Sequence, residues 1–185
     1  MGRSSGGGGR GGGGGVSSLD KKISNMILVK ESSIYRNKRE SAYVIDSNGN
    51  VIADKVGTKN GVTVYLSNEE MNGSVFTHNH PGGSSFSTND ICVASKGNLK
   101  EIRAVGEVDG KRYIYSAKPG RNGWPTRNAI ANAYNRYQQE VKNELVNGFR
   151  DGTISKSQYY KTDVNHESWL RVAQELGFVY TRNEF

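Results

Sequence analysis

The sequence predicts an α+β fold, in which a mixed, largely antiparallel sheet is flanked by helices. Two observations lead to this prediction. Short alternating apolar segments lie between Gly-containing turns, and longer segments carry apolar residues at three- and four-residue spacing. The 185 residues leave room for one ordinary domain with a single core. We expect a disordered Gly-rich tail over 1–18 and a single domain over 19–185.

The first half of that domain is expected to form mainly strands. An Asp-Ser-Asn-Gly turn separates two short apolar segments, as is typical of a hairpin. Alternation over 62–66 predicts another strand, followed by a short acidic loop at Glu69 and Glu70. The expected segments are a helix or strand over 19–30, strands over 42–45, 51–53 and 62–66, and a strand through Val75 and Phe76 that leads to His78.

The second half is expected to end in helices. Apolar residues recur over 126–150 at helical spacing, and this stripe is expected to pack against the sheet in a helical extension over about 126–185. Gly97, Gly152 and Gly177 follow helical segments, where glycine commonly ends a helix. The expected elements are helices over 88–96, 126–150 and 167–176, and strands over 102–105, 113–115 and 178–180.

Two of the chain's three histidines, His78 and His80, lie two residues apart at the end of an apolar segment. In a strand, residues at this spacing point to the same face, so both imidazoles can reach one point. The Gly/Ser-rich segment 81–86 can turn sharply and bring Asp90, on the first turn of the next helix, to the same place. Two nitrogens and one carboxylate leave a fourth tetrahedral position open, which is typical of a catalytic zinc site.

The pattern Glu40, His78-x-His80-Pro81 and Ser87-x-x-Asp90 resembles that of the JAMM (JAB/MPN-type) zinc metalloproteases. The sequence around these residues is most similar to that of JAMM-like domains of bacteriophage and mobile-element proteins. The resemblance implies a JAMM/cytidine-deaminase-like α/β sandwich with Zn2+ as cofactor. It implies His78, His80 and Asp90 as metal ligands, Glu40 as general base and Ser87 as oxyanion donor. One departure is that six residues separate His80 from Ser87, where the family usually has seven.

Several of these residues also have structural interpretations. Ser87-x-x-Asp90 matches a helix capping box, which is compatible with a ligand role for Asp90. Glu40 follows Lys38 and Arg39 and could be a solvated surface group; in that case Glu31 would be the next candidate for the base. His166 is expected to be a surface or capping residue at the start of the last helix. Cys92 is expected to be a buried thiol.

Charge and cysteine content bear on partners and compartment. The net charge is +7, and basic residues concentrate over 96–121, where they could form a basic rim near the metal site that steers an acidic protein segment or nucleic acid. A single cysteine excludes an intrachain disulfide framework and favours a reducing compartment. No apolar segment is long enough to cross a membrane. We expect a cytoplasmic protein of a bacterial or phage-infected cell.

Two functions from different classes remain open. The first is a zinc-dependent metallopeptidase or isopeptidase acting on a protein or peptide substrate, such as a ubiquitin-like protein or a flexible tail. The second is a non-catalytic JAMM-like scaffold, for example a phage morphogenesis or nucleic-acid-associated binding module. The full set of Glu40, Ser87 and three ligands favours the enzyme, because a scaffold does not need all five residues. The substrate and the oligomeric state are not set by these patterns.

Overall fold

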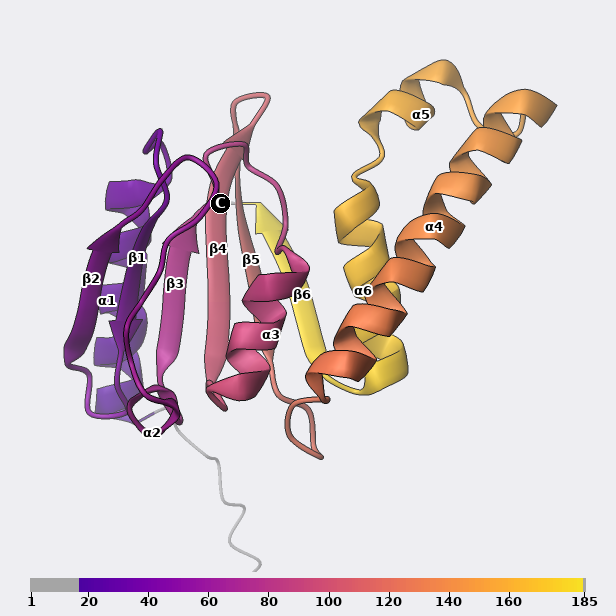
Figure 1. Ribbon diagram of the computed structural model, residues 1–185. Helices are drawn as coiled ribbons and strands as arrows, with labels where there is room; N and C mark the ends of the chain where they lie inside the picture. The colour runs from indigo at the N-terminus through magenta and orange to yellow at the C-terminus, as the bar shows by residue number, and fades with distance from the viewer. Residues whose placement is uncertain (1–16, 185) are drawn as a thin grey trace, which may run out of the picture.

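A six-stranded mixed sheet with helices on both faces forms residues 17–184, the part of the chain that the computed structural model describes (Figure 1). The predicted α+β class is confirmed. The strands are β1 (Ser41–Ile45), β2 (Val51–Val56), β3 (Val75–Asn79), β4 (Glu101–Val108), β5 (Lys111–Lys118) and β6 (Val179–Glu184). The helices of this part are α1 (Ser18–Ile34), α2 (Asn68–Met71), α3 (Thr88–Lys96), α4 (Arg127–Asp151), α5 (Lys156–Lys161) and α6 (Val164–Leu176).

The strand order is β2-β1-β3-β4-β5-β6, which places β3 and β4 in the middle of the sheet. Only β3 and β4 pair in parallel, and the crossover between them contains α3. The remaining neighbours pair antiparallel, with Ala42 of β1 opposite His78 of β3. Because β3 is central, all five of its residues are buried, and its side chains alternate between the two faces.

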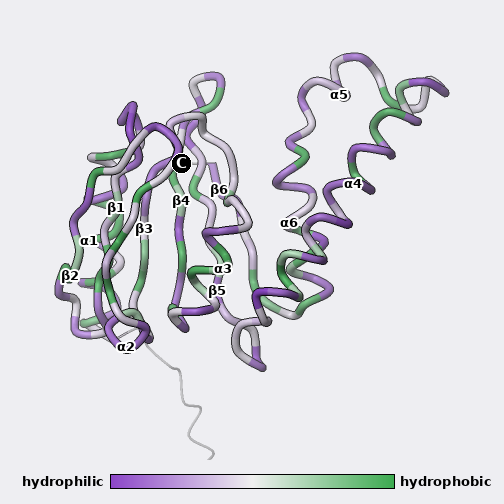
Figure 2. Tube along the Cα trace, in the orientation of Figure 1, coloured by the Kyte–Doolittle hydropathy of each residue, from purple (hydrophilic) through white to green (hydrophobic). Residues whose placement is uncertain are grey.

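The two faces of the sheet are covered by different helices. Helix α1 contacts β3 and β1 on one face, and α3 contacts β4 on the other, so the two helices lie on opposite sides in Figure 1. The main apolar core lies on the α3 face, where α4 and α6 join it through Tyr134 and Trp169, whose rings are 4.4 Å apart. Figure 2 shows hydrophobic residues along the central strands and hydrophilic residues along much of α4.

The prediction of a strand over 62–66 is wrong. Val62, Val64 and Leu66 do point inward and pack on the core, while Thr63 and Tyr65 are exposed, so the alternation is real. No strand of the described residues pairs with this segment, which therefore covers the α3 face as an extended loop. Alternation of apolar and polar residues indicates an extended segment with one buried face. It does not indicate whether another strand lies beside the segment to form hydrogen bonds with it. The acidic pair Glu69 and Glu70 lies in the short helix α2 rather than in a loop.

The C-terminal part follows the prediction at helix ends and departs from it in packing. Helix α4 begins after the cap Thr126 and ends at Gly152, whose φ is 81°. Its apolar stripe packs on α6 and α3, not directly on the sheet as expected. Helix α5 was not expected, and α6 begins at Val164, earlier than the expected start. Strand β6 then returns to the sheet beside β5, so the extension is part of the sheet as well as of the helical layer.

At the N-terminal end the open choice between helix and strand is settled as helix. Ser17 caps α1 by accepting a hydrogen bond from the amide of Asp20, so the helix begins just inside the segment assigned to the tail. The rest of the expected Gly-rich tail, residues 1–16, lies outside the described residues. Within 17–184, no helix has the length and apolar character needed to span a membrane.

Candidate metal centre

His78 and His80 lie at the end of β3 and point to the α3 face, as the alternation of the strand predicts. Their Nε2 atoms are 3.0 Å apart. The His78 ring stacks on Phe76, with 5.2 Å between ring centres and 13° between the planes. Both imidazoles are buried, at 1% and 8% exposure, so their cost of desolvation must be offset by specific partners.

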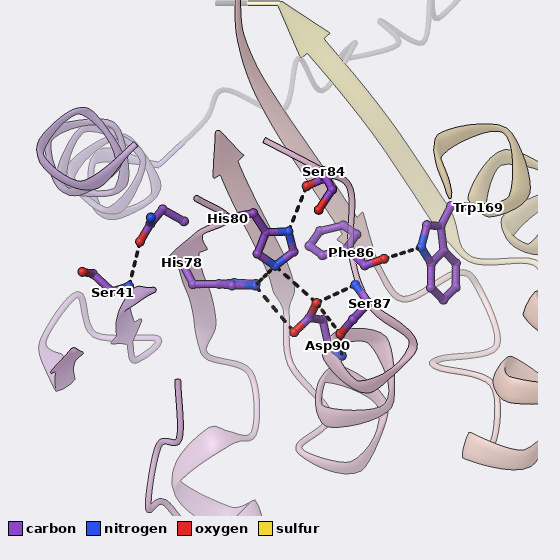
Figure 3. A network of polar contacts seen from close by, with 9 residues as sticks. Ser41, His78, His80, Ser84, Phe86, Ser87, Asp90 and Trp169 are labelled. Carbon is purple, nitrogen blue, oxygen red and sulfur yellow. Dashed lines mark hydrogen bonds and ion pairs between the residues drawn. The ribbon is translucent and has the colours of Figure 1, made fainter. Parts of the chain in front are cut away.

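Asp90 joins the two histidines from the first turn of α3. Its Oδ1 lies 3.6 Å from Nε2 of His78, and its Oδ2 lies 3.5 Å from Nε2 of His80 (Figure 3). The expected capping box is confirmed: the amide of Asp90 donates to Oγ of Ser87, while the amide and hydroxyl of Ser87 donate to Oδ2 of Asp90. The cap therefore fixes the helix start and the carboxylate together.

These three side chains fit a zinc ion by their spacing and donor type. Their ligand atoms all lie within 4.8 Å of one another. Ligands of a tetrahedral zinc at bond lengths of about 2.0–2.2 Å are separated by roughly 3.3 Å, close to the three separations in the cluster. Neutral imidazole nitrogens and a carboxylate oxygen are the donors that zinc takes in catalytic sites, where three protein ligands leave one position open.

The orientation of His80 is fixed by the backbone. Its Nδ1 lies 2.8 Å from the carbonyl oxygen of Ser84, which can only accept a hydrogen bond (Figure 3). The proton of neutral His80 is therefore on Nδ1, and the lone pair of Nε2 faces Asp90 and His78. This arrangement, a ligand histidine oriented by an outer carbonyl, is usual in zinc sites.

Three aromatic side chains hold the loop that supplies this carbonyl. Tyr115 donates to the carbonyl of Gly83, Trp169 donates to the carbonyl of Phe86, and the hydroxyl of Tyr180 lies 2.7 Å from Oγ of Ser85. Gly83 has a φ of 71°, and a Cβ there would collide with Val108 and the carbonyl of Glu107. The loop between His80 and Ser87 is thus fixed from β5, β6 and α6.

His78 differs from His80 in its second nitrogen. Nδ1 of His78 is buried and has no hydrogen-bond partner among residues 17–184. It lies in an apolar slot between Phe76 and Phe86, whose ring centres are 5.2 and 6.4 Å from its own. A buried polar atom left unpaired is costly, so the polar interactions of this ring are concentrated at Nε2, on the side of the metal cluster.

Glu40 immediately precedes β1 and lines the same cavity as the three ligands. Its position is fixed by the backbone, since its amide donates to Thr58 and its carbonyl accepts from Gly57. The carboxylate is not one of the ligand atoms that lie within 4.8 Å of one another. Glu40 therefore shares the cavity with the cluster without belonging to it. Glu31, the fallback candidate, lies on the opposite face under α1, where it pairs with Arg103.

The ionisation of the cluster is set by burial and by mutual charge. Burial raises the pKa of Glu40, and the charge of Asp90 adds to this, while His80 and His78 act in the opposite direction. Burial alone would raise the pKa of Asp90, but the two histidines hold it far below its usual range. Burial lowers the pKa of His80, yet Asp90 and the Ser84 carbonyl outweigh it and raise the pKa overall. The cluster thus holds Asp90 ionised, whereas burial makes Glu40 easier to protonate.

The cluster opens onto a cavity of about 790 Å³, within the range of ligand sites. The segment 59–64, α3 and the loop 80–87 form much of its wall. Apart from His78 and His80, Lys59 is the one basic residue among those that line the cavity. None of the basic residues of 96–121 lines it, so the expected basic rim is not formed there. Arg103, for example, is paired with Glu31 and Glu101 under α1.

Two other sequence interpretations can be compared with the structure. His166 was expected to be a surface or capping residue, but it is buried, the cap of α6 is Asp163, and Nδ1 of His166 lies 2.9 Å from the hydroxyl of Tyr180. The residues around His166 in the sequence do not predict this contact, because it joins α6 to β6. Cys92 is a buried free thiol, as expected.

Sequence reasoning did not identify the far wall of the cavity. Tyr134 and Gln138 of α4 and Asn165 of α6 line it. Tyr134 belongs to a helical apolar stripe and was assigned to the core, where its ring does pack on Trp169. Gln138 and Asn165 belong to no recognisable motif, and only the packing of α4 against α6 shows that they meet at the cavity.

Comparison of the chain with protein-family models, with curated proteins and with solved structures gives no match.

Proposed function

We propose that the chain is a zinc-dependent metallopeptidase or isopeptidase. The observation that carries the proposal is the convergence of His78, His80 and Asp90 at one point, on a cavity of about 790 Å³ that Glu40 also lines. A purely structural metal site usually has four protein ligands and no adjoining cavity. Three ligands with an acid in the same cavity favour hydrolysis over a scaffold role.

Each residue has a defined part in the proposed hydrolysis. His78, His80 and Asp90 would hold the zinc, and bound zinc supplies a Lewis acid that polarises a carbonyl and favours ionisation of water. Glu40 takes a proton from the attacking water as the new C–O bond forms. It then delivers this proton to the leaving nitrogen as the C–N bond breaks. The raised pKa of Glu40 suits this exchange, because a base that must later act as an acid works best when its pKa is near the working pH.

Ser87 is proposed as the donor to the developing oxyanion. Its hydroxyl lines the cavity, which supports the assignment, and it donates to Asp90 as part of the helix cap, which competes with it. Ser87→Ala separates the two roles. Loss of an oxyanion donor lowers turnover by roughly 10²-fold. Loss of the cap alone lowers the free energy of unfolding by about 1 kcal/mol and leaves turnover per folded molecule unchanged.

The proposed substrate is a protein or peptide, such as a ubiquitin-like protein or a flexible tail, and the proposed compartment is the cytoplasm. The apolar wall of the cavity, which includes Val62, Val64 and Phe76, supports a substrate with neutral, partly apolar side chains. A reducing compartment accords with the free thiol of Cys92.

The test compares the wild type with Glu40→Gln and with Glu69→Gln, a control at an exposed glutamate outside the cavity. Zinc content is measured on protein purified without chelator, and cleavage is measured on casein, isopeptide-linked ubiquitin dimers and blocked peptides. We expect about one zinc per chain in all three proteins. We expect Glu40→Gln alone to lose cleavage by about 10³-fold or more, because the base acts on the transition state. Wild type with less than a tenth of an equivalent of zinc, or Glu40→Gln that cleaves at the wild-type rate, would refute the proposal.

A further inference from the structure

The far wall of the cavity contains three polar side chains in mutual contact, Tyr134 and Gln138 from α4 and Asn165 from α6. The Tyr134 hydroxyl donates to Oδ1 of Asn165 at 2.9 Å. Nε2 of Gln138 donates at 3.3 Å to both the Tyr134 hydroxyl and the same Oδ1 of Asn165. Oδ1 of Asn165 therefore has two donors, which occupy both of its lone pairs.

The direction of these hydrogen bonds is fixed by a lysine. Nζ of Lys142, one helical turn beyond Gln138, lies 3.0 Å from Oε1 of Gln138. An ammonium group has donors and no acceptor, so Gln138 must present its oxygen to Lys142 and its NH₂ group to Asn165. Asn165 must in turn present its oxygen to Gln138. The amide orientation of Asn165, which is otherwise ambiguous, follows from the charge of Lys142.

The remaining group of Asn165 is its Nδ2 amide, which carries two N–H donors. Within residues 17–184 no hydrogen bond from this nitrogen is formed, although Asn165 is half-buried and lines the cavity. An oriented donor on a cavity wall with no acceptor supplied by the protein is suited to an acceptor on a bound molecule.

The rest of the wall limits what that acceptor can be. Apart from the two histidines, Lys59 is the one basic residue that lines the cavity, against the carboxyl groups of Glu40 and Asp90, so the wall lacks the excess of basic side chains that a polyanion such as nucleic acid requires. Val62, Val64 and Met71 add apolar surface that suits uncharged side chains. A neutral carbonyl oxygen satisfies both conditions, and an extended peptide offers one at every residue.

We propose that Asn165 is a substrate-binding residue, held by Gln138 and Lys142, whose Nδ2 amide binds a backbone carbonyl oxygen of an extended peptide in the cavity. The inference rests on the proposed function and names the part of the substrate that the C-terminal helices recognise. It also gives these helices a role at the site, beyond closing the core.

Asn165→Asp tests the proposal with little change in shape. The aspartate keeps an oxygen acceptor toward Tyr134 and Gln138 and replaces only the donor with a charged acceptor. Asn143→Asp on α4 is the matched control, because Asn143 is exposed, accepts a hydrogen bond from Gln139 and does not line the cavity. Lys142→Met removes the charge that orients the amides.

Binding is measured in a zinc-loaded Glu40→Gln background, so that cleavage does not interfere. The probe is fluorescein-labelled β-casein, an unfolded protein, followed by fluorescence anisotropy at 0.15 M salt. We expect Asn165→Asp to weaken binding at least about tenfold, Lys142→Met to weaken it by about threefold, and Asn143→Asp to change it by less than about twofold.

The outcomes separate this proposal from the function on which it rests. Asn165→Asp that binds casein as tightly as its parent, or a parent that binds no casein, overturns the subsite. Equal weakening by Asn165→Asp and Asn143→Asp also overturns it, because the effect would then be one of net charge. A wild type that binds casein through Asn165 yet lacks zinc or cleaves nothing would overturn the peptidase and leave the subsite standing.

Discussion

The two faces of β3 carry two buried polar clusters that differ in how completely they are paired. Under α1 lies a charged cluster formed by Glu31, Arg103 and Glu101, with Thr77 and Ser116 at its edges. On the α3 face lies the candidate metal site formed by His78, His80 and Asp90, called the metal cluster below. Thr77 and His78 are consecutive residues of one strand, so neighbours in the sequence belong to opposite clusters.

The charged cluster is closed. Arg103 binds both oxygens of Glu31, at 2.6 and 3.0 Å, and an oxygen of Glu101 at 2.8 Å. Thr77 donates to Glu31, and Ser116 donates to Glu101. This matches the usual condition for burying charges in a fold, in which each one is paired and hydrogen-bonded.

The metal cluster is open by comparison. Nδ1 of His78 has no partner within the described part of the chain, the nitrogens of two rings face one carboxylate, and the cluster lines a cavity. Buried polar groups are usually satisfied by the protein itself, so a less completely paired cluster that lines a cavity is a candidate for binding a ligand. The comparison therefore favours a structural role for the α1 face and supports the proposed chemical role of the α3 face, and the following experiments can break or sharpen it.

The largest effect is expected for His80→Ala. Removing one of three ligands should weaken zinc binding by more than the 10- to 100-fold that follows loss of an outer partner, so that purified protein holds less than a tenth of an equivalent. The free energy of unfolding of the zinc-free protein should fall by only about 1 kcal/mol, for the lost contact to the Ser84 carbonyl. Elemental analysis and denaturant unfolding with chelator check both values. Full zinc content in this variant would show that zinc binds at another site.

The second effect concerns Arg103→Met, which leaves the buried carboxylate of Glu31 without its cation and leaves Glu101 with only Lys118, at 3.5 Å. The free energy of unfolding should fall by about 3–5 kcal/mol, while zinc bound per folded molecule stays unchanged. A triple variant that adds Glu31→Gln and Glu101→Gln should recover much of the loss, because it removes the unpaired charges. A loss below about 1 kcal/mol in the single variant would mean that the charged cluster is less closed than its hydrogen bonds indicate.

The two clusters should also respond to acid in different ranges. Burial raises the pKa of Glu101, but Ser116, Arg103 and Lys118 outweigh it and lower the pKa below its ordinary value of 4.5. A depressed pKa gives stability that is present above pH 4.5 and is lost as pH falls through the folded-state value. Zinc binding requires neutral histidines, and the pKa of His80 is raised above the ordinary 6.5, so protons should already compete with zinc as the pH falls toward that value, well before Glu101 is protonated. Zinc release and unfolding, followed in one acid titration, should be separate transitions; coincident ones would contradict the comparison.

The sequence predicted local features whose cause is local. Helix α3 runs from Thr88 to Lys96 as expected, because Ser87 and Gly97 mark its ends by capping chemistry. The meeting of His78, His80 and Asp90 was also predicted, since strand alternation and a helix cap place them. Zinc and hydrolysis stay predictions, because geometry alone does not identify the ion or the reaction.

Features that depend on distant partners were missed. Val62 and Val64 alternate like a strand, and their failure to join the sheet depends on which segments lie beside them. His166 is buried because Tyr180, on the last strand, meets its ring. The cavity role of Asn165 depends on Lys142 and Gln138 from another helix. In each case the deciding contact joins residues far apart in the chain, which patterning within one segment cannot reveal.

The smallest effect, and the narrowest test of the comparison, is expected for Thr77→Val. The change removes one hydrogen bond to Glu31, whose carboxylate keeps its two bonds from Arg103, and valine fills nearly the same volume. The free energy of unfolding should fall by about 1 kcal/mol. Zinc content and affinity should stay the same, although Thr77 precedes the ligand His78 directly, because their side chains point to opposite faces. A zinc affinity lowered tenfold at unchanged stability would show that the two faces are coupled through the strand, and the division between a structural face and a chemical face would have to be abandoned.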